Sequence, residues 1–74
     1  MAAEQTDHLV KMANQIAINT GAARDAELSA QRTGEHIRKF WTPAMRAQLT
    51  QYWREGGEGL EPVVAMALRA ENAH

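Results

Sequence analysis

Residues that cap or break helices divide this 74-residue sequence into four short segments, and this division limits the folds that the chain can adopt. Between the breaks, apolar side chains recur three and four residues apart, the spacing that places them on one face of a helix. No segment shows the alternation of apolar and polar residues that a half-buried strand needs. The sequence therefore predicts an all-α fold in one domain over residues 1–74: a small helical bundle of three main helices plus a short C-terminal fourth helix.

The first two segments are separated at Gly21, a residue type that often follows the last turn of a helix. Thr6 is expected to cap the first helix, because a threonine hydroxyl can accept a hydrogen bond from a free backbone N–H of the first turn. Gly34 lies inside the second segment, where it either breaks the helix or lets another backbone come close. The predicted apolar faces are Leu9, Met12, Ala13, Ile16 and Ala17, and then Ala23, Ala26, Ala30, Thr33, Ile37, Phe40 and Trp41.

The sequence Thr42-Pro43 predicts that a third helix starts at a tight corner, because threonine caps well and proline is tolerated in a first turn. Gly56-Gly57 should end this helix, and Pro62 fits the first turn of the fourth. Residues 1–5 and 70–74 are expected to fray. The apolar faces here are Met45, Leu49, Tyr52 and Trp53, and then Leu60, Val63, Val64, Ala67 and Leu68.

The chain contains no cysteine, so neither a disulfide nor a thiolate metal site can stabilise it. A chain of this length buries only about 60% of the surface that its unfolded form exposes, which leaves it marginally stable by itself. A partner protein is the support that remains. The sequence leaves open whether the isolated chain is a monomer, self-associates through exposed aromatic residues, or becomes ordered only on its partner.

No catalytic, cofactor-binding or metal site is expected in this chain. The histidines His8, His36 and His74 lie far apart, and none has a second ligand at the spacing that would place both on one helix face. The one serine, Ser29, has no histidine at helical spacing to activate it. The apolar runs are all shorter than the roughly 20 residues of a membrane span, and no signal peptide is apparent, so we expect a cytoplasmic protein.

The segment from His36 to Arg54 combines cations and aromatic residues and contains no acidic residue. Nucleic acid could use such a patch, but the net charge of the chain is −1, and cations in the last turn of a helix are already favoured by the helix dipole. Arginine and tryptophan are also frequent anchors of protein interfaces. We therefore expect a protein partner, bound through His36, Arg38, Lys39, Trp41, Met45 and Arg46.

Three stretches together resemble the delta subunit family of the soluble, NAD-dependent, molybdenum-containing formate dehydrogenases of bacteria. The resemblance extends from His8 to Leu68, and the middle stretch is its most specific part. The family often has aspartate before the proline of that stretch, where this chain has Thr42, which caps a helix by the same chemistry. The three stretches are His8-Leu9-Val10-Lys11-Met12-Ala13-Asn14-Gln15-Ile16-Ala17, His36-Ile37-Arg38-Lys39-Phe40-Trp41-Thr42-Pro43-Ala44-Met45-Arg46 and Gly59-Leu60-Glu61-Pro62-Val63-Val64.

This resemblance implies an accessory subunit of a complex that oxidises formate to carbon dioxide and reduces NAD. The partners it implies are a catalytic subunit with a molybdenum cofactor and iron-sulfur clusters, and diaphorase subunits with FMN and further clusters. Two other hypotheses remain: a maturation factor that assists insertion of the molybdenum cofactor, and a small helical nucleic-acid-binding module built around the Trp41-Thr42-Pro43 corner. The stretch from Asn19 to Gly34 matches no motif, and no role is assigned to it.

Overall fold

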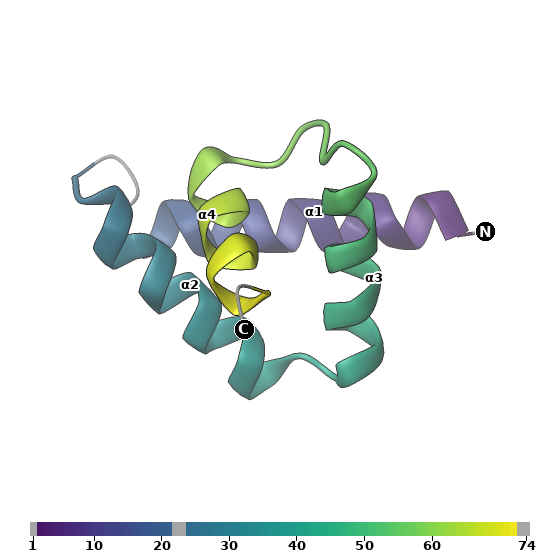
Figure 1. The fold of residues 1–74 in the computed structure, drawn as a ribbon, viewed down its shortest axis with the longest axis horizontal. Helices are drawn as coiled ribbons and strands as arrows, with labels where there is room; N and C mark the ends of the chain where they lie inside the picture. The colour runs from purple at the N-terminus through teal and green to yellow at the C-terminus, as the bar shows by residue number, and fades with distance from the viewer. Residues whose placement is uncertain (1, 22–23, 73–74) are drawn as a thin grey trace.

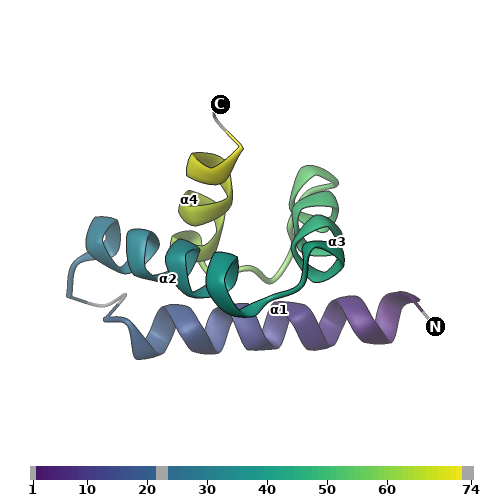
Figure 2. The ribbon, with the colours of Figure 1, turned by 90° about the horizontal axis from the view of Figure 1, so that it is seen from below.

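The computed structural model describes residues 2–21 and 24–72, and these residues form four helices, which confirms the all-α prediction. The helices are α1 (Ala2–Asn19), α2 (Ala26–Phe40), α3 (Pro43–Arg54) and α4 (Pro62–Glu71). Helix α1 runs along the length of the molecule, and α3 and α4 rise from the same side of it (Figures 1 and 2). The most extensive contact joins α2 to α4, whereas α3 and α4 touch much less. Helix α3 therefore packs mainly on α1 and makes little contact with α4.

Helix α1 starts earlier than the sequence analysis predicted. It begins at Ala2, so Thr6 lies within the helix and its predicted role as the cap is wrong. Alanine, glutamate and glutamine are strong helix formers, and they occupy positions 2–5, so the helix extends over the stretch that was expected to fray. The Thr6 hydroxyl instead accepts a hydrogen bond of 3.0 Å from the Gln48 side chain, which ties α1 to α3.

Helix α2 begins at Ala26 and runs through Gly34 without a break. Its cap is Asp25, whose carboxylate accepts a hydrogen bond from the Leu28 N–H at 3.1 Å. A Cβ atom at Gly34 would lie 3.8 Å from the Cβ of Ala67 in α4, so this glycine is a place of close approach between helices. Ala26, which was assigned to the apolar face, is exposed, and Ala23 lies outside the described residues.

The corner between α2 and α3 is formed as predicted. The Thr42 hydroxyl accepts a hydrogen bond from the Met45 N–H at 3.1 Å, and Pro43 is the first residue of α3. Helix α3 ends just before the two predicted glycines. The second, Gly57, has a backbone φ of +62°, a value that residues other than glycine rarely adopt. Pro62 opens α4, which continues to Glu71. Of the ends expected to fray, Met1, Ala73 and His74 lie outside the described residues.

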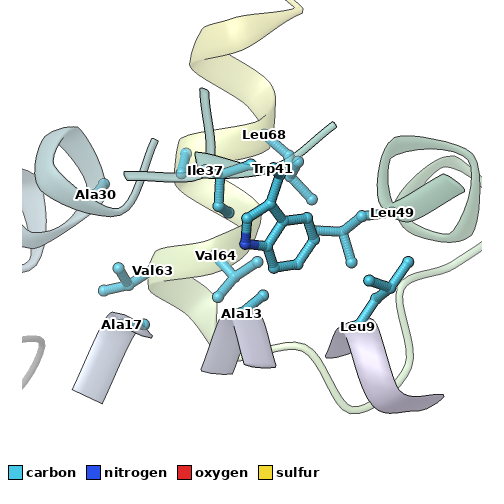
Figure 3. Close-up of a cluster of buried hydrophobic side chains, with 11 residues drawn as sticks. Leu9, Ala13, Ala17, Ala30, Ile37, Trp41, Leu49, Val63, Val64 and Leu68 are labelled. Carbon is cyan, nitrogen blue, oxygen red and sulfur yellow. The ribbon is translucent and has the colours of Figure 1, made fainter. Parts of the chain in front are cut away.

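The hydrophobic core is assembled from all four helices around the Trp41 side chain, which is 6% exposed (Figure 3). Phe40, the preceding residue, was also predicted to lie in the core, but that prediction is wrong, because its side chain is 71% exposed. Helical periodicity places Phe40 near the face of Thr33, but no other described element covers its ring at the last turn of α2. The buried apolar residues are Leu9, Ala13, Ala17, Ala30, Ile37, Trp41, Leu49, Val63, Val64, Ala67 and Leu68.

Hydroxyl groups hold the end of α1 against α2. The side chains of Ser29 and Thr33 are fully buried, and the Thr20 hydroxyl lies 2.7 Å from the first and 3.2 Å from the second. Ser29 also donates a hydrogen bond to the Ala17 carbonyl at 3.1 Å. These bonds satisfy polar groups that would otherwise be costly to bury. They give part of the stretch from Asn19 to Gly34 a structural role that its sequence did not reveal.

Asn14 fastens the connection between α3 and α4 to α1. Its side-chain amide donates a hydrogen bond to the Gly59 carbonyl at 2.9 Å, and its side-chain oxygen accepts one from the Glu61 N–H at 2.8 Å. The first and last stretches of the resemblance, residues 8–17 and 59–64, are therefore joined by hydrogen bonds of this side chain as well as by the core.

Candidate partner interface

The six residues predicted to contact a partner do not share one surface. Successive residues of an α-helix are about 100° apart, so His36 and Arg38 project from nearly opposite sides of α2. Arg38 and Arg46 line a cleft between helices, whereas His36 and Lys39 are exposed elsewhere on α2. Trp41 is in the core, and Met45 is half-buried against it. The structure therefore separates the predicted site into two surfaces and two residues that support the fold.

The first surface lies on the last turns of α2 and is called the outer surface here; it consists of His36, Lys39 and Phe40, all exposed. The rings of His36 and Phe40 stack at a tilt of 44°, with 4.7 Å between their centroids. Phe40 was not among the predicted interface residues. Of the two adjacent aromatic residues at the end of α2, only Trp41 enters the core, and the sequence does not show which of the two is buried.

The second surface is a cleft between α2, α3 and α4 with a volume of about 420 Å³. Buried apolar residues, Ile37 from α2 and Leu68 from α4, form part of its lining. Polar side chains from successive turns of α3 form one wall. The lining residues are Gly34, Ile37, Arg38, Arg46, Ala47, Thr50, Gln51, Arg54, Ala67, Leu68, Glu71 and Asn72.

Positive charge dominates this cleft, which three arginines and one glutamate line. Arg38 forms an ion pair with Glu71, with 3.2 Å between Nη1 and Oε1. Arg54 donates a hydrogen bond of 3.3 Å to the Asn72 side chain. The Nε atom of Arg46 is buried, and no described residue accepts a hydrogen bond from it. The cleft therefore has a formal charge of +2 and one buried donor without an acceptor.

The described residues offer no evident place for a metal ion. Within residues 2–21 and 24–72, no group of three or more histidine, aspartate or glutamate side chains could hold one. His8 and His36 lie on different helices, and His74 is outside the described residues. None of the helices in this part of the chain is both long enough and apolar enough to cross a membrane.

Similarity to known proteins was found at the level of the family. Neither a curated protein nor a solved structure matches the chain. A family model described as the NADH-dependent formate dehydrogenase delta subunit, FdsD, matches residues 8–68. The matched region begins in α1, ends in α4, and contains the outer surface and most of the cleft. The chain therefore belongs to the delta subunit family of the NADH-dependent formate dehydrogenases.

Proposed function

We propose that this chain is a non-catalytic subunit that binds the catalytic subunit of a cytoplasmic NAD-dependent formate dehydrogenase and stabilises the assembled complex. The observation that carries this proposal is the family match over residues 8–68. The complex would oxidise formate to carbon dioxide and reduce NAD to NADH. The molybdenum cofactor, the iron-sulfur clusters and FMN would be held by the partner subunits.

The outer surface supports a role in binding. Phe40 exposes 71% of its side chain, although it sits next to the most buried aromatic residue of the chain. Aromatic residues are enriched at protein interfaces, and burying a ring of this size in a partner contributes about 1–2 kcal/mol from its apolar area. The neighbouring His36 ring holds Phe40 through the stacking contact, which lowers the conformational entropy that binding would remove. The three residues of this surface are all exposed and therefore accessible to a partner.

The test is an affinity purification of the tagged chain from its own host, grown on formate with molybdate, followed by quantitative mass spectrometry. Recovery of the catalytic and diaphorase subunits, with one copy of this chain per catalytic subunit in the active enzyme, supports a structural subunit. Recovery of the catalytic subunit only before it holds its cofactor, with the chain absent from active enzyme, favours the maturation factor. Recovery of none of these subunits contradicts both roles.

A matched pair of variants connects the test to the outer surface. Phe40→Ala should reduce recovery of the catalytic subunit, because it removes the exposed ring without touching the core. Ile18→Ala removes an apolar side chain that is 57% exposed on α1, far from the outer surface in sequence, and should leave recovery unchanged. Equal recovery with both variants would exclude Phe40 from the interface.

A further inference from the structure

We infer that the cleft between α2, α3 and α4 binds an acidic segment of a partner subunit, with an apolar side chain of that segment inserted between the helices and its carboxylates placed on the arginines. This inference rests on the proposed function, because it names the chemistry by which the partner is recognised. The outer surface contributes an apolar contact; the cleft would supply the charge that selects the partner.

The first support is the arrangement of α3. Arg46, Thr50 and Arg54 are four residues apart, so they lie one above another on the face of α3 that lines the cleft. Helix α4 leaves this face largely uncovered, since α3 and α4 make little contact. A volume of about 420 Å³ is within the range of sites that bind ligands, and the buried side chains of Ile37 and Leu68 give it an apolar lining. The cleft thus has an apolar interior with cations along one wall.

The second support is the unsatisfied donor on Arg46. Arg46 lines the cleft, and its Nε atom has no acceptor among the described residues, so this guanidinium group is not already paired through Nε with a carboxylate of the chain. A guanidinium group pairs best with a carboxylate, because two parallel N–H groups can bind both oxygens. The formal charge of +2 in the cleft favours such a ligand over a neutral one. The chemistry that completes this site is therefore an aspartate or glutamate side chain.

The third support is Glu71, which already places a carboxylate in the cleft. It pairs with Arg38 at 3.2 Å, which shows that the lining accommodates a carboxylate beside an arginine. Both side chains are substantially exposed, at 55% for Arg38 and 37% for Glu71, so the pair is weak and an incoming carboxylate can displace it. Glu71 thus competes with the partner for Arg38. Its removal should tighten binding, an effect that a purely structural role for these residues does not predict.

A second groove, between α2 and α4, adjoins the cleft, shares Arg38 and Glu71 with it, and carries the opposite net charge. This groove is lined by the carboxylates of Glu27, Glu35 and Glu71, and Arg38 is the single cation in its lining. An acidic segment is repelled by this groove and attracted by the cleft. A second copy of the chain, which could offer its own acidic groove, is the competing occupant, and the experiment below distinguishes it from a partner subunit.

The first part of the experiment compares variants of the full chain as bait in the affinity purification. Arg46→Glu and Arg54→Glu should each reduce recovery of the catalytic subunit by at least about tenfold, because both put a carboxylate where the partner carries one. Arg32→Glu makes the same change at an exposed arginine of α2 outside the cleft, and should leave recovery unchanged. Glu71→Gln should raise the salt concentration at which the complex dissociates. Circular dichroism measures the helix content of each variant and so checks that it is folded.

The second part identifies the occupant. Thr50, in the cleft wall, is replaced by the photo-crosslinking residue p-benzoylphenylalanine, with Ala26 as the exposed control position. After irradiation of the purified complex, mass spectrometry should find Thr50 joined to a peptide of a partner subunit that contains aspartate or glutamate, with no such product from position 26. A crosslink to a second copy of this chain, or to a partner peptide without acidic residues, overturns the inference.

The inference and the proposed function fail in different ways. If the wild-type chain recovers the catalytic subunit but both arginine variants recover it equally well, the cleft is not the binding site and the proposed function stands. If Glu71→Gln weakens the complex as much as the arginine variants do, Glu71 does not compete with the partner, and this also contradicts the inference. If the wild-type chain recovers no subunit of formate dehydrogenase, the proposed function fails and the inference fails with it.

Discussion

Trp41 and Phe40 are adjacent aromatic residues with opposite environments, and they predict opposite effects when each is replaced by alanine. Trp41 is 6% exposed among side chains of four helices, so Trp41→Ala should cost about 3–5 kcal/mol through lost burial and the cavity that remains. A folded protein is stable by about 0.05–0.15 kcal/mol per residue, which gives about 4–11 kcal/mol for 74 residues, and small domains lie at the lower end. Trp41→Ala should therefore leave much of the chain unfolded. Phe40→Ala should change the stability by less than about 0.5 kcal/mol, because the ring is 71% exposed.

Urea unfolding followed by far-UV circular dichroism measures this difference without relying on the fluorescence of the residue being removed. The slope of the unfolding free energy against urea concentration should stay the same for Phe40→Ala, since the core is unchanged and unfolding exposes nearly the same surface area. Trp41→Phe is the control, because it keeps an aromatic ring in the core and should lose less stability than Trp41→Ala. If Phe40→Ala and Trp41→Ala destabilise the chain equally, the assignment of one ring to the core and the other to the surface is wrong.

Three further predictions concern single positions that determine the course of the chain. Asn14→Ala removes both hydrogen bonds to the α3–α4 connection and should cost about 1–3 kcal/mol in chemical denaturation, whereas Asn14→Asp keeps the acceptor and should cost less. Gly57→Ala should cost about 1–2 kcal/mol, because position 57 has a φ of +62°; an unchanged midpoint would show that this turn adjusts freely. Thr42→Ala should lower the stability by about 0.5–2 kcal/mol through loss of the cap of α3, and Thr42→Ser should restore it; chemical denaturation of both variants measures the difference.

Local signals in the sequence located most of the helices. Thr42-Pro43 and Gly56-Gly57 act within one turn of the chain, so their roles as cap and stop do not depend on distant residues. The start of α1 was placed wrongly because helix formers before Thr6 outweighed the capping tendency of the threonine, and because Gln48 of α3 gave its hydroxyl another partner. A contact between helices decided that outcome, and no local pattern contains it.

The candidate site was harder to predict than the fold for the same reason. Periodicity assigns Phe40 to the buried face of α2, but a side chain is buried only where another element packs against that turn of the helix. Only the packing of the helices shows that no other described element covers Phe40. The cleft depends on how far α3 stands from α4, and its lining combines Arg38, Arg46 and Glu71 from three helices. The sequence indicated two of these residues through their charge. It gave no signal that Arg54 and Glu71 belong to the same place.

Within residues 36–46, the most specific stretch of the family resemblance, the structure distinguishes residues that support the fold from residues that do not. Trp41 and Thr42 serve the fold, because one fills the core and the other caps α3. Phe40 and Arg46 have no comparable role, since the ring of Phe40 lies in solvent and the Nε atom of Arg46 has no acceptor among the described residues. Exposing a large ring and burying an unpaired donor are both unfavourable for an isolated chain, so the stretch is better suited to a chain with a partner than to one that stands alone. A partner that covers the Phe40 ring should relieve the first of these penalties on assembly. Hydrogen exchange at the backbones of α2, α3 and α4, which line the cleft, should then slow in the complex by more than at α1, and slowing spread equally over the four helices would count against a partner seated in the cleft.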